Sequence, residues 1–260
     1  PIPRRQRQMC IRDSSKAQKI LQRLYDMHLK ENKLAKPDYL LSEMLGYAYW
    51  WDKKNDEAKI YHEQALKGYE EIFGDESHYL IQPLLNVAMV YFNEKNYKKT
   101  DYYLRRSLGI QFKYIQDQIP FLPISKRNQF IKTLGISYQA IFTATDIDPQ
   151  GKNLALFARL NRHGLLEDIE KKQITLASLK GSDKELMQKI KDLTNQLSST
   201  NQDNKKSLDK LKLEKEKLEL ALYKSLPQLK SKIYSLNDIS KEIPEDAVLI
   251  EFQKYRPYIF

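Results

Sequence analysis

The chain carries the same residue pattern twice, in segments 45–66 and 87–108, which lie 42 residues apart. Each position of the pattern in the first segment is matched in the second by an identical residue or by one of similar size or polarity. The matched pairs are Leu45 with Val87, Gly46 with Ala88, Tyr49 with Tyr91, Ala58 with Thr100, Ala65 with Ser107 and Leu66 with Leu108. Self-similarity at a fixed period is typical of stacked repeats. Such a stack is usually a surface that holds other proteins, and it usually lacks a catalytic pocket.

Each copy of the pattern predicts two helices that are joined by a tight turn. The expected helices span about 39–52 and 56–73 in the first repeat and about 80–93 and 97–116 in the second. Gly46 and Ala88 would let the two helices of a pair approach closely, because neither residue carries a large side chain. The fold class that follows is all-α, with helical pairs stacked into a solenoid.

A helix is also expected before the repeats, at residues 14–32. Its Ala17 and Leu24 lie 41 residues before Ala58 and Ala65, which are positions of the repeated pattern. This helix therefore resembles the second half of an earlier, incomplete repeat.

The segments after the repeats predict further helices. Apolar residues at helical spacing predict one long helix at about 125–145, which would cover the open end of the stack, and another at 152–178. From 183 to 224 the apolar residues follow spacings of four and three, as in a coiled-coil seam. The polar run 198–206 interrupts this seam. We favour an antiparallel helical hairpin with its tip near residue 200 over one continuous helix with a polar patch.

The C-terminal part predicts a short helix near 237–243 and then a β-strand at 247–252, which is dense in β-forming residues. A single strand has no partner for its backbone hydrogen bonds, so the simplest expectation is that the chain is the front part of a longer protein. The expected domains are a flexible N-terminus at 1–13, repeats at 14–118 (a half repeat at 14–36 and full repeats at 39–78 and 81–118), covering helices at 119–178, the hairpin at 179–226, and a linker with the first strand at 227–260.

Residues 39–116 resemble tetratricopeptide repeats of the 42-residue kind that occurs in kinesin light chains. The residues that carry the resemblance are Leu45, Gly46, Tyr49, Ala58 and Ala65 in the first repeat and Leu84, Asn86, Val87, Ala88, Tyr91 and Leu108 in the second. The linker 73–78 is similar to the Leu-Gly-Pro-Asp-His-Pro turn of that kind, although it lacks both prolines. The resemblance implies a helical scaffold that binds a peptide or a protein.

The remainder of the chain resembles the region that leads into the CHAT domain, a caspase-like domain often found in cyanobacteria. Residues 161–167 are similar to an Asn-Arg-Lys-Gly-Leu segment of that region, and residues 243–257 look like the first strand of the domain. The family's peptidase chemistry uses a His–Cys dyad well downstream of that strand, so no position of this chain receives those roles. The resemblance implies an adaptor region without catalytic activity. The front part of a CHAT-type cysteine peptidase is the alternative.

Composition and charge limit the kinds of partner, compartment and cofactor that we expect. The formal charge of +10 is compatible with a nucleic-acid partner, but the lysines are mixed with acidic residues and few aromatic residues lie among them. Nucleic-acid binding is therefore kept only as a second alternative. The single cysteine, Cys10, fits a reducing compartment, so we expect a cytoplasmic protein. No stretch is long and apolar enough to span a bilayer. The four histidines have no metal-ligand spacing, and neither a metal nor a cofactor is expected.

The best candidate site is the concave face of the stack, which the first helix of each pair would line. The candidate groove residues are Glu43, Tyr47 and Trp50 in the first repeat and Leu85, Asn86, Met89 and Asn93 in the second. By analogy with the family, Asn86 stands where a side-chain amide, which both donates and accepts, bonds a peptide backbone. The alternative is that some of the aromatic residues belong to the core. The expected partner is a protein or peptide, and the hairpin is expected to be a spacer rather than a second binding surface.

Overall fold

The computed structural model describes residues 4–31, 38–148, 151–179, 181–200, 205–226 and 233–257. These residues form helices, turns and extended segments, and none of them lies in a strand. The chain divides into two compact units. Unit 1 consists of Pro1–Gln111, Ile136–Ala155 and Tyr255–Phe260, and unit 2 consists of Phe112–Gly135 and Leu156–Lys254. The division into domains that the sequence suggested stays a prediction.

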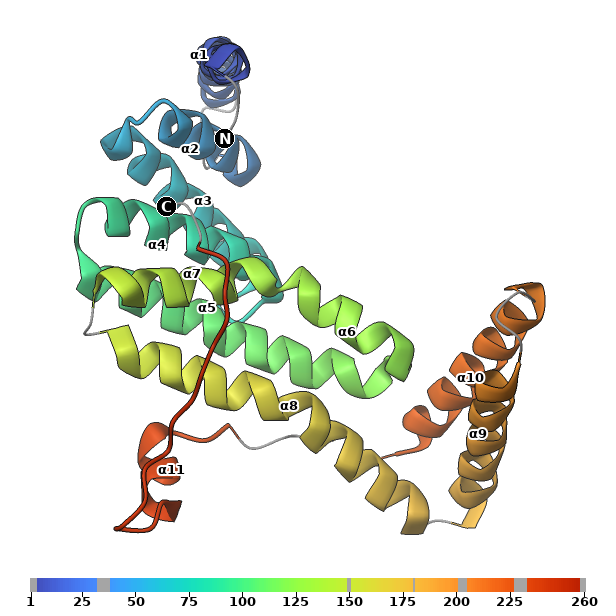
Figure 1. The fold of residues 1–260 in the computed structure, drawn as a ribbon. Coiled ribbons are helices and arrows are strands. Elements are labelled where there is room, and N and C mark those ends of the chain that lie inside the picture. The colour runs from blue at the N-terminus through green and yellow to red at the C-terminus, as the bar shows by residue number, and fades with distance from the viewer. Residues whose placement is uncertain are drawn as a thin grey trace. The chain divides into compact units, whose positions relative to one another are not determined.

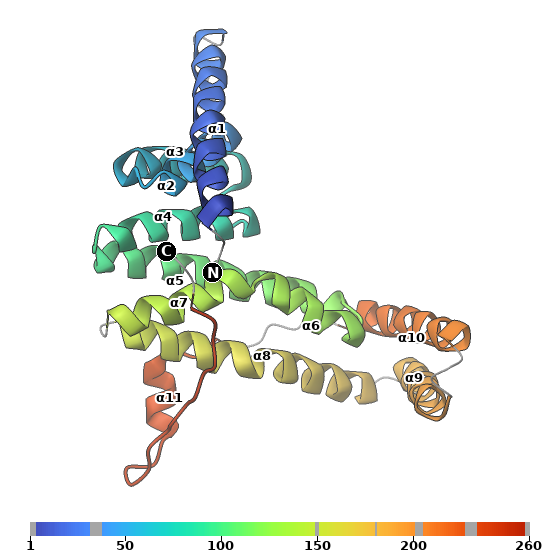
Figure 2. The same ribbon diagram turned by 45° about the horizontal axis from the view of Figure 1, so that its top comes forward.

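The repeats in unit 1 form the expected helical pairs, and the all-α fold class is confirmed (Figures 1 and 2). The helices of the two repeats are α2 (Tyr39–Trp51), α3 (Asn55–Phe73), α4 (Ile81–Asn93) and α5 (Tyr97–Gln118), with the short 3-10 helix η1 (His78–Leu80) before α4. The helix α1 (Arg4–Glu31) precedes them and begins well before the predicted start at residue 14.

The turn inside each repeat has the same backbone geometry. Lys53 and Lys95 both adopt left-handed φ angles, 61° and 59°. The residue after each of them donates its backbone N–H to the carbonyl of Tyr49 or Tyr91, at 3.0 and 2.9 Å. These bonds satisfy carbonyl groups that the end of a helix leaves without an intrahelical partner. The 42-residue period is therefore obeyed by the backbone as well as by the side chains.

A stacked pair of tyrosines also recurs at the repeat period. The rings of Tyr49 and Tyr61 lie 5.3 Å apart between centroids and are parallel to within 5°. Those of Tyr91 and Tyr103 lie 5.6 Å apart and are parallel to within 6°. Offset aromatic stacking of this kind adds to the area buried between two helices. In each repeat the stack fastens the first helix to the second near the turn.

The small residues of the pattern allow close packing, as expected. Gly46 faces the ring of His62, and a Cβ at position 46 would lie 2.5 Å from His62 Nδ1. Ala58 and Ala65 are buried, and so are their counterparts Thr100 and Ser107. A larger side chain at these positions would separate the helices. The first repeat therefore admits the imidazole of His62 only because residue 46 is glycine.

Burial of His62 predicts that unit 1 loses stability in mild acid. Desolvation lowers the pKa of His62 from 6.5 to about 4. Above pH 6.5 the ring is neutral in both states, but between the two pKa values the unfolded chain takes up the proton and the folded chain does not. The free energy of unfolding should fall by about 3 kcal/mol across this window. Urea unfolding followed by tryptophan fluorescence at a series of pH values measures the loss.

The variant His62→Gln is the control for that prediction, because glutamine does not titrate. Its stability should change much less than that of the natural chain as the pH falls to the depressed pKa. Glu43 acts in the opposite direction, since burial raises the pKa of its carboxyl group and protonation relieves that cost. Equal slopes for the variant and the natural chain would contradict the assignment to His62.

The single helix expected at 125–145 is wrong, because the structure has two helices there. They are α6 (Ile124–Thr133) and α7 (Gly135–Ile147). Glycine disfavours a helix interior, and Arg162 stabilises the break from outside. Its guanidinium donates to the backbone carbonyls of Ile131 and Leu134, at 2.9 and 3.3 Å. The carbonyl of Ile131 also accepts from the backbone N–H of Leu134 at 3.2 Å, so Arg162 adds a second donor where α6 ends.

The run 159–167, which includes the residues 161–167 singled out above, belongs to α8 (Lys152–Leu179), which confirms the expected helix at 152–178. Within unit 2, Asn161 holds the backbone of Tyr234 by two hydrogen bonds. Its Nδ2 donates to the carbonyl of Tyr234 at 2.9 Å, and its Oδ1 accepts from the N–H at 2.8 Å. Arg159 pairs with Glu251 at 3.3 Å. The run therefore fastens the C-terminal segment to α8.

The short helix near 237–243 is confirmed as α11 (Leu236–Glu242), but the β-strand expected at 247–252 is wrong in this structure. Residues 248–257 have no regular secondary structure, and the described chain offers no second strand to pair with them. Val248, Ile250 and Phe252 are 83%, 68% and 83% exposed. Strand propensity is realised only through packing and ladder hydrogen bonds, and both are missing here.

The helical hairpin is confirmed by α9 (Gly181–Ser199) and α10 (Lys205–Ser225), which run side by side (Figure 1). Ser225 Oγ donates to Asp183 Oδ1 at 2.9 Å, which joins the end of α10 to the start of α9 and makes the pair antiparallel. The apolar residues that pack together at this end are Ala177, Leu222, Tyr223 and Leu226, with Leu176, Leu186, Met187 and Ile190 against them. The tip at 201–204 and Pro227 lie outside the described residues.

Candidate partner-binding surface

The helix α2 presents a row of large apolar side chains to solvent. Leu40, Met44 and Trp51 are 50%, 55% and 65% exposed, and Tyr47 between them is half-buried. Their spacing of four, three and four residues places all of them on one face of the helix. We call these four residues the α2 stripe. Exposed apolar residues that are contiguous mark an interaction site far more often than scattered ones do.

A cluster of five polar side chains lies beside the stripe and joins α2, α3 and α4. Tyr69 Oη donates to Glu43 Oε2 at 2.8 Å, and Asn86 Nδ2 donates to Glu43 Oε1 at 3.2 Å. Tyr47 Oη donates to Asn86 Oδ1 at 2.8 Å. Gln82 Nε2 lies 2.8 Å from Asn86 Oδ1 and 3.0 Å from Tyr47 Oη. We call this set the polar cluster. Because each member is held by another, the cluster fixes the orientation of the Tyr47 ring in the stripe.

Burial shapes the charge of the polar cluster. Burial raises the pKa of Glu43. The hydrogen bonds from Tyr69 and Asn86 oppose this effect only in part, so the pKa stays raised. Burial and the neighbouring carboxylate of Glu43 together raise the pKa of Tyr69, so this phenol keeps its proton and stays a donor. The cluster therefore holds one carboxyl group that accepts hydrogen bonds from Tyr69 and Asn86.

The structure brings some predicted groove residues together and buries others. Glu43, Tyr47 and Asn86 form one hydrogen-bonded group, as described above. Asn86 is only 1% exposed, and Leu85 and Met89 are also buried. These three side chains support the surface from below and offer a ligand no accessible area.

The remaining two predicted residues lie at the surface. Trp50 is half-buried, and its ring packs edge-on against Trp51 with 4.9 Å between centroids. Asn93 is exposed at the end of α4, where its amide donates to Asn55 Oδ1 at 3.4 Å. Trp50 therefore contacts the stripe through Trp51, and Asn93 contacts the start of α3.

Leu40, Met44 and Trp51 were missed by reasoning from the sequence alone. The predicted α2 residues followed from the place of the first helix on the concave face of a stack, and the apolar residues that the repeated pattern leaves unused were not considered. Leu45, Gly46 and Tyr49 belong to the pattern, and the stripe occupies the opposite face. The apolar positions of the helix that do not belong to the repeated pattern would have identified the stripe.

Among the described residues, no group of three or more His, Cys, Asp or Glu side chains is placed to hold a metal ion. Within the same residues, no helix combines the length and the apolar character that crossing a membrane requires.

Comparison with known proteins agrees with the geometry of the repeats. Residues 39–111 match the family model described as Tetratricopeptide repeat. This segment, which makes up less than a third of the chain, is similar to tetratricopeptide repeats. No curated protein and no solved structure matched the chain. Tetratricopeptide repeats generally mediate protein–protein interactions and are typically non-catalytic. The matched segment contains α2, α3 and α4, and with them the α2 stripe and the polar cluster.

Proposed function

We propose that the chain is a protein-binding scaffold that holds a segment of a partner protein on the α2 stripe. The observation that carries this proposal is the exposure of three large apolar side chains in a row beside a fully interlocked polar cluster. A row of this kind gains free energy when a partner covers it. The partner class is a peptide or protein segment with apolar side chains at regular spacing.

Rigidity of the surface supports this function. The side chains of the polar cluster are ordered before a partner arrives, so binding does not have to freeze them. Tyr and Trp offer large contact areas with few rotatable bonds, as at binding hot spots. We propose that Glu43, Tyr47, Trp50 and Asn93 contact the partner directly. Asn86, Leu85 and Met89 hold these residues in place.

Removing two apolar side chains of the stripe should weaken capture of such a segment. We expect the double variant Met44→Ala/Trp51→Ala to weaken binding about tenfold or more, because apolar and aromatic anchors dominate interface energies. The ligands for this test are peptides selected from a random library on the immobilised full chain, and their affinities are measured by fluorescence anisotropy. The two tryptophans of the chain are both in α2, so binding there should also shift the intrinsic fluorescence of the natural protein.

The control for this test is Ile60→Ala, which removes an exposed apolar side chain from α3, outside the stripe. It should change the affinity by less than about twofold. If the selected peptides bind the double variant as tightly as the natural chain and leave tryptophan fluorescence unchanged, the stripe is not the binding surface.

The resemblance to the region before a CHAT domain supports a further proposal for the C-terminal segment. We propose that residues 247–252 form the first strand of a sheet that a following domain completes. Support comes from the exposed Val248, Ile250 and Phe252 and from a backbone that lacks a ladder partner in the described chain. The test is to read the gene beyond the codon for Phe260. An open frame that encodes further strands would support the proposed sheet, and a His–Cys dyad in it would support a peptidase. A stop codon would refute both.

A further inference from the structure

The helix α1 packs against the first repeat by one face only. Tyr25 is buried, and its hydroxyl donates to Gln64 Oε1 at 2.8 Å. Gln22 Oε1 accepts from the hydroxyls of Tyr49 and Tyr61, each at 3.0 Å. These polar and aromatic contacts fix the rotation of α1 about its axis. They therefore also fix which of its side chains remain outside.

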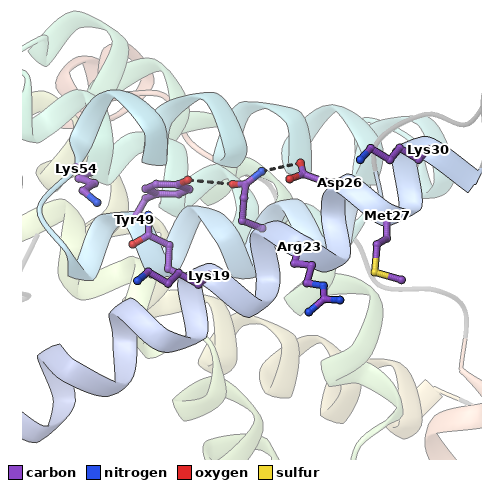
Figure 3. Close-up of a pocket in the computed structure, with 9 residues that line it drawn as sticks. Lys19, Arg23, Asp26, Met27, Lys30, Tyr49 and Lys54 are labelled. Carbon is purple, nitrogen blue, oxygen red and sulfur yellow. Dashed lines mark hydrogen bonds between the residues drawn. The ribbon is translucent and has the colours of Figure 1, made fainter.

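A basic pocket lies between the outer side of α1 and the end of α2. Its volume is about 550 Å³, which is within the range of about 300–1,000 Å³ that is usual for ligand pockets. Figure 3 shows Tyr49 and Lys54, at the end of α2 and in the turn that follows it, across from Lys19 and Asp26 on α1. The lining residues are Gln18, Lys19, Gln22, Arg23, Asp26, Met27, Lys30, Tyr49 and Lys54.

The pocket holds cations that the described chain does not neutralise. Lys54 is paired with Asp52 at 2.7 Å. Lys19, Arg23 and Lys30 have no ion-pair or hydrogen-bond partner among the described residues. Asp26 is the one carboxylate in the lining, so three unpaired cations and one carboxylate leave a net charge of +2. A cavity that concentrates charge of one sign attracts ligands of the opposite sign.

An exposed apolar row runs along α1 next to these cations. Ile20, Leu24 and Met27 are 62%, 45% and 44% exposed, and their spacing of four and three residues puts them on one face. On a helical projection this face adjoins the one that carries Lys19, Arg23 and Lys30, and Met27 belongs to both the row and the pocket. The outer side of α1 is thus apolar along one edge and cationic along the next.

We propose that α1 and the end of α2 form a second docking surface, which binds an acidic amphipathic segment of another protein. Carboxylates of that segment pair with Lys19, Arg23 and Lys30 in the pocket. Its apolar side chains cover Ile20, Leu24 and Met27. The surface lies mostly on α1, which is outside the residues that match the repeat family.

Charge and shape select this occupant over others. A second copy of the chain would place one basic α1 against another, and the chain as a whole carries +10. A bilayer surface is flat and does not enter a pocket between two helices. Nucleic acid pairs with the cations but does not bury an apolar row. An acidic helix with apolar residues at spacings of three and four can contact both the apolar row and the cations of α1.

The test uses a fluorescein-labelled synthetic helical peptide of Glu and Leu, with Leu at helical spacing, and the full chain. Anisotropy should show binding that weakens as salt is added. The variant Lys19→Glu/Arg23→Glu should weaken binding about tenfold, because two attractive pairs become repulsive. The control Lys212→Glu/Lys217→Glu changes the net charge equally on exposed residues of α10 and should change the affinity by less than about twofold. Met44→Ala/Trp51→Ala should leave this peptide's binding intact, which separates the second surface from the α2 stripe.

Several results would overturn the proposal. Equal losses in the two charge-reversed variants would mean that the peptide responds only to net charge. Equal binding of a peptide with Gln in place of Glu would remove the role of the cations. Binding of phosphatidylserine vesicles or duplex DNA that Lys19→Glu/Arg23→Glu abolishes, while peptide binding persists, would assign the surface to a different partner. Circular dichroism melting should be the same for all variants, because every altered side chain is exposed.

Discussion

Replacing Gly46 by alanine is expected to lower the free energy of unfolding of unit 1 by about 2 kcal/mol. A Cβ at this position would lie 2.5, 2.6 and 2.8 Å from Nδ1, Cε1 and Cγ of His62. His62 is only 3% exposed, and the ring of Tyr47 packs against it nearly at a right angle, with 5.2 Å between centroids. The ring therefore has no space to move into, and α2 must separate from α3. The gain in helix propensity of about 1 kcal/mol offsets only part of this cost.

The matched control is Gly109→Ala in α5, which belongs to the same unit. A Cβ at Gly109 would meet no atom within 4 Å. This variant should gain about 0.5–1 kcal/mol, because alanine replaces glycine in an exposed helix interior without a clash. Thermal and urea unfolding measure both changes, and opposite signs are the expected result.

A double variant identifies the cause of the Gly46 effect. Gly46→Ala/His62→Ala should lose less stability than the sum of the two single variants, with a coupling energy of about 1 kcal/mol or more, because the clash disappears with the imidazole. Additive losses would show that the methyl group is harmful for another reason. A stable Gly46→Ala variant would show that α2 and α3 do not pack as closely as the structure has them.

Local sequence signals predicted the two repeats of unit 1 well, because the same constraints occur twice in the chain. Two copies of one pattern gave the helix boundaries of α2 to α5 to within a few residues, and the roles of Gly46 and of the small residues followed from the spacing. The pattern did not predict which residue fills the space beside Gly46. His62 is a polar residue at a core position, and only its packing shows that it is neutral and buried there.

The errors occurred where tertiary contacts decide the local structure. At the break between α6 and α7, Arg162, which is distant in sequence, donates to the carbonyls of Ile131 and Leu134. The strand expected at 247–252 has suitable residues and no partner, and strand formation needs the partner. Within the candidate site, side-chain burial on α4 could not be read from helical spacing, because nearly every face of that helix is covered. Asn86 thus turned out to be a support for Glu43 and Tyr47.

Replacing Arg127 by methionine is expected to destabilise unit 2 by about 3 kcal/mol. The guanidinium is buried at the start of α6 and joins three parts of the unit. Its Nε donates to the carbonyl of Leu122 at 3.0 Å, and its two Nη atoms donate to Gln173 Oε1 at 2.6 Å and to Glu170 Oε1 at 3.3 Å. It also lies 4.9 Å from the centre of the Tyr223 ring in α10. Methionine fills much of the volume but leaves the acceptors of Leu122 and Gln173 without a donor.

The measurement that localises this loss is hydrogen exchange. Protection should fall in α6, α8 and α10, which the guanidinium joins, and should stay unchanged in α2, α3 and α4 of unit 1. The control is Lys172→Met on α8, which removes an exposed ion pair with Asp168 at 2.7 Å. That variant should lose less than about 0.5 kcal/mol, because screened surface pairs contribute little. If the two variants unfold alike, Arg127 is not the residue that holds the hairpin against α6 and α8, and the apolar contacts of Leu222 and Tyr223 alone must do so.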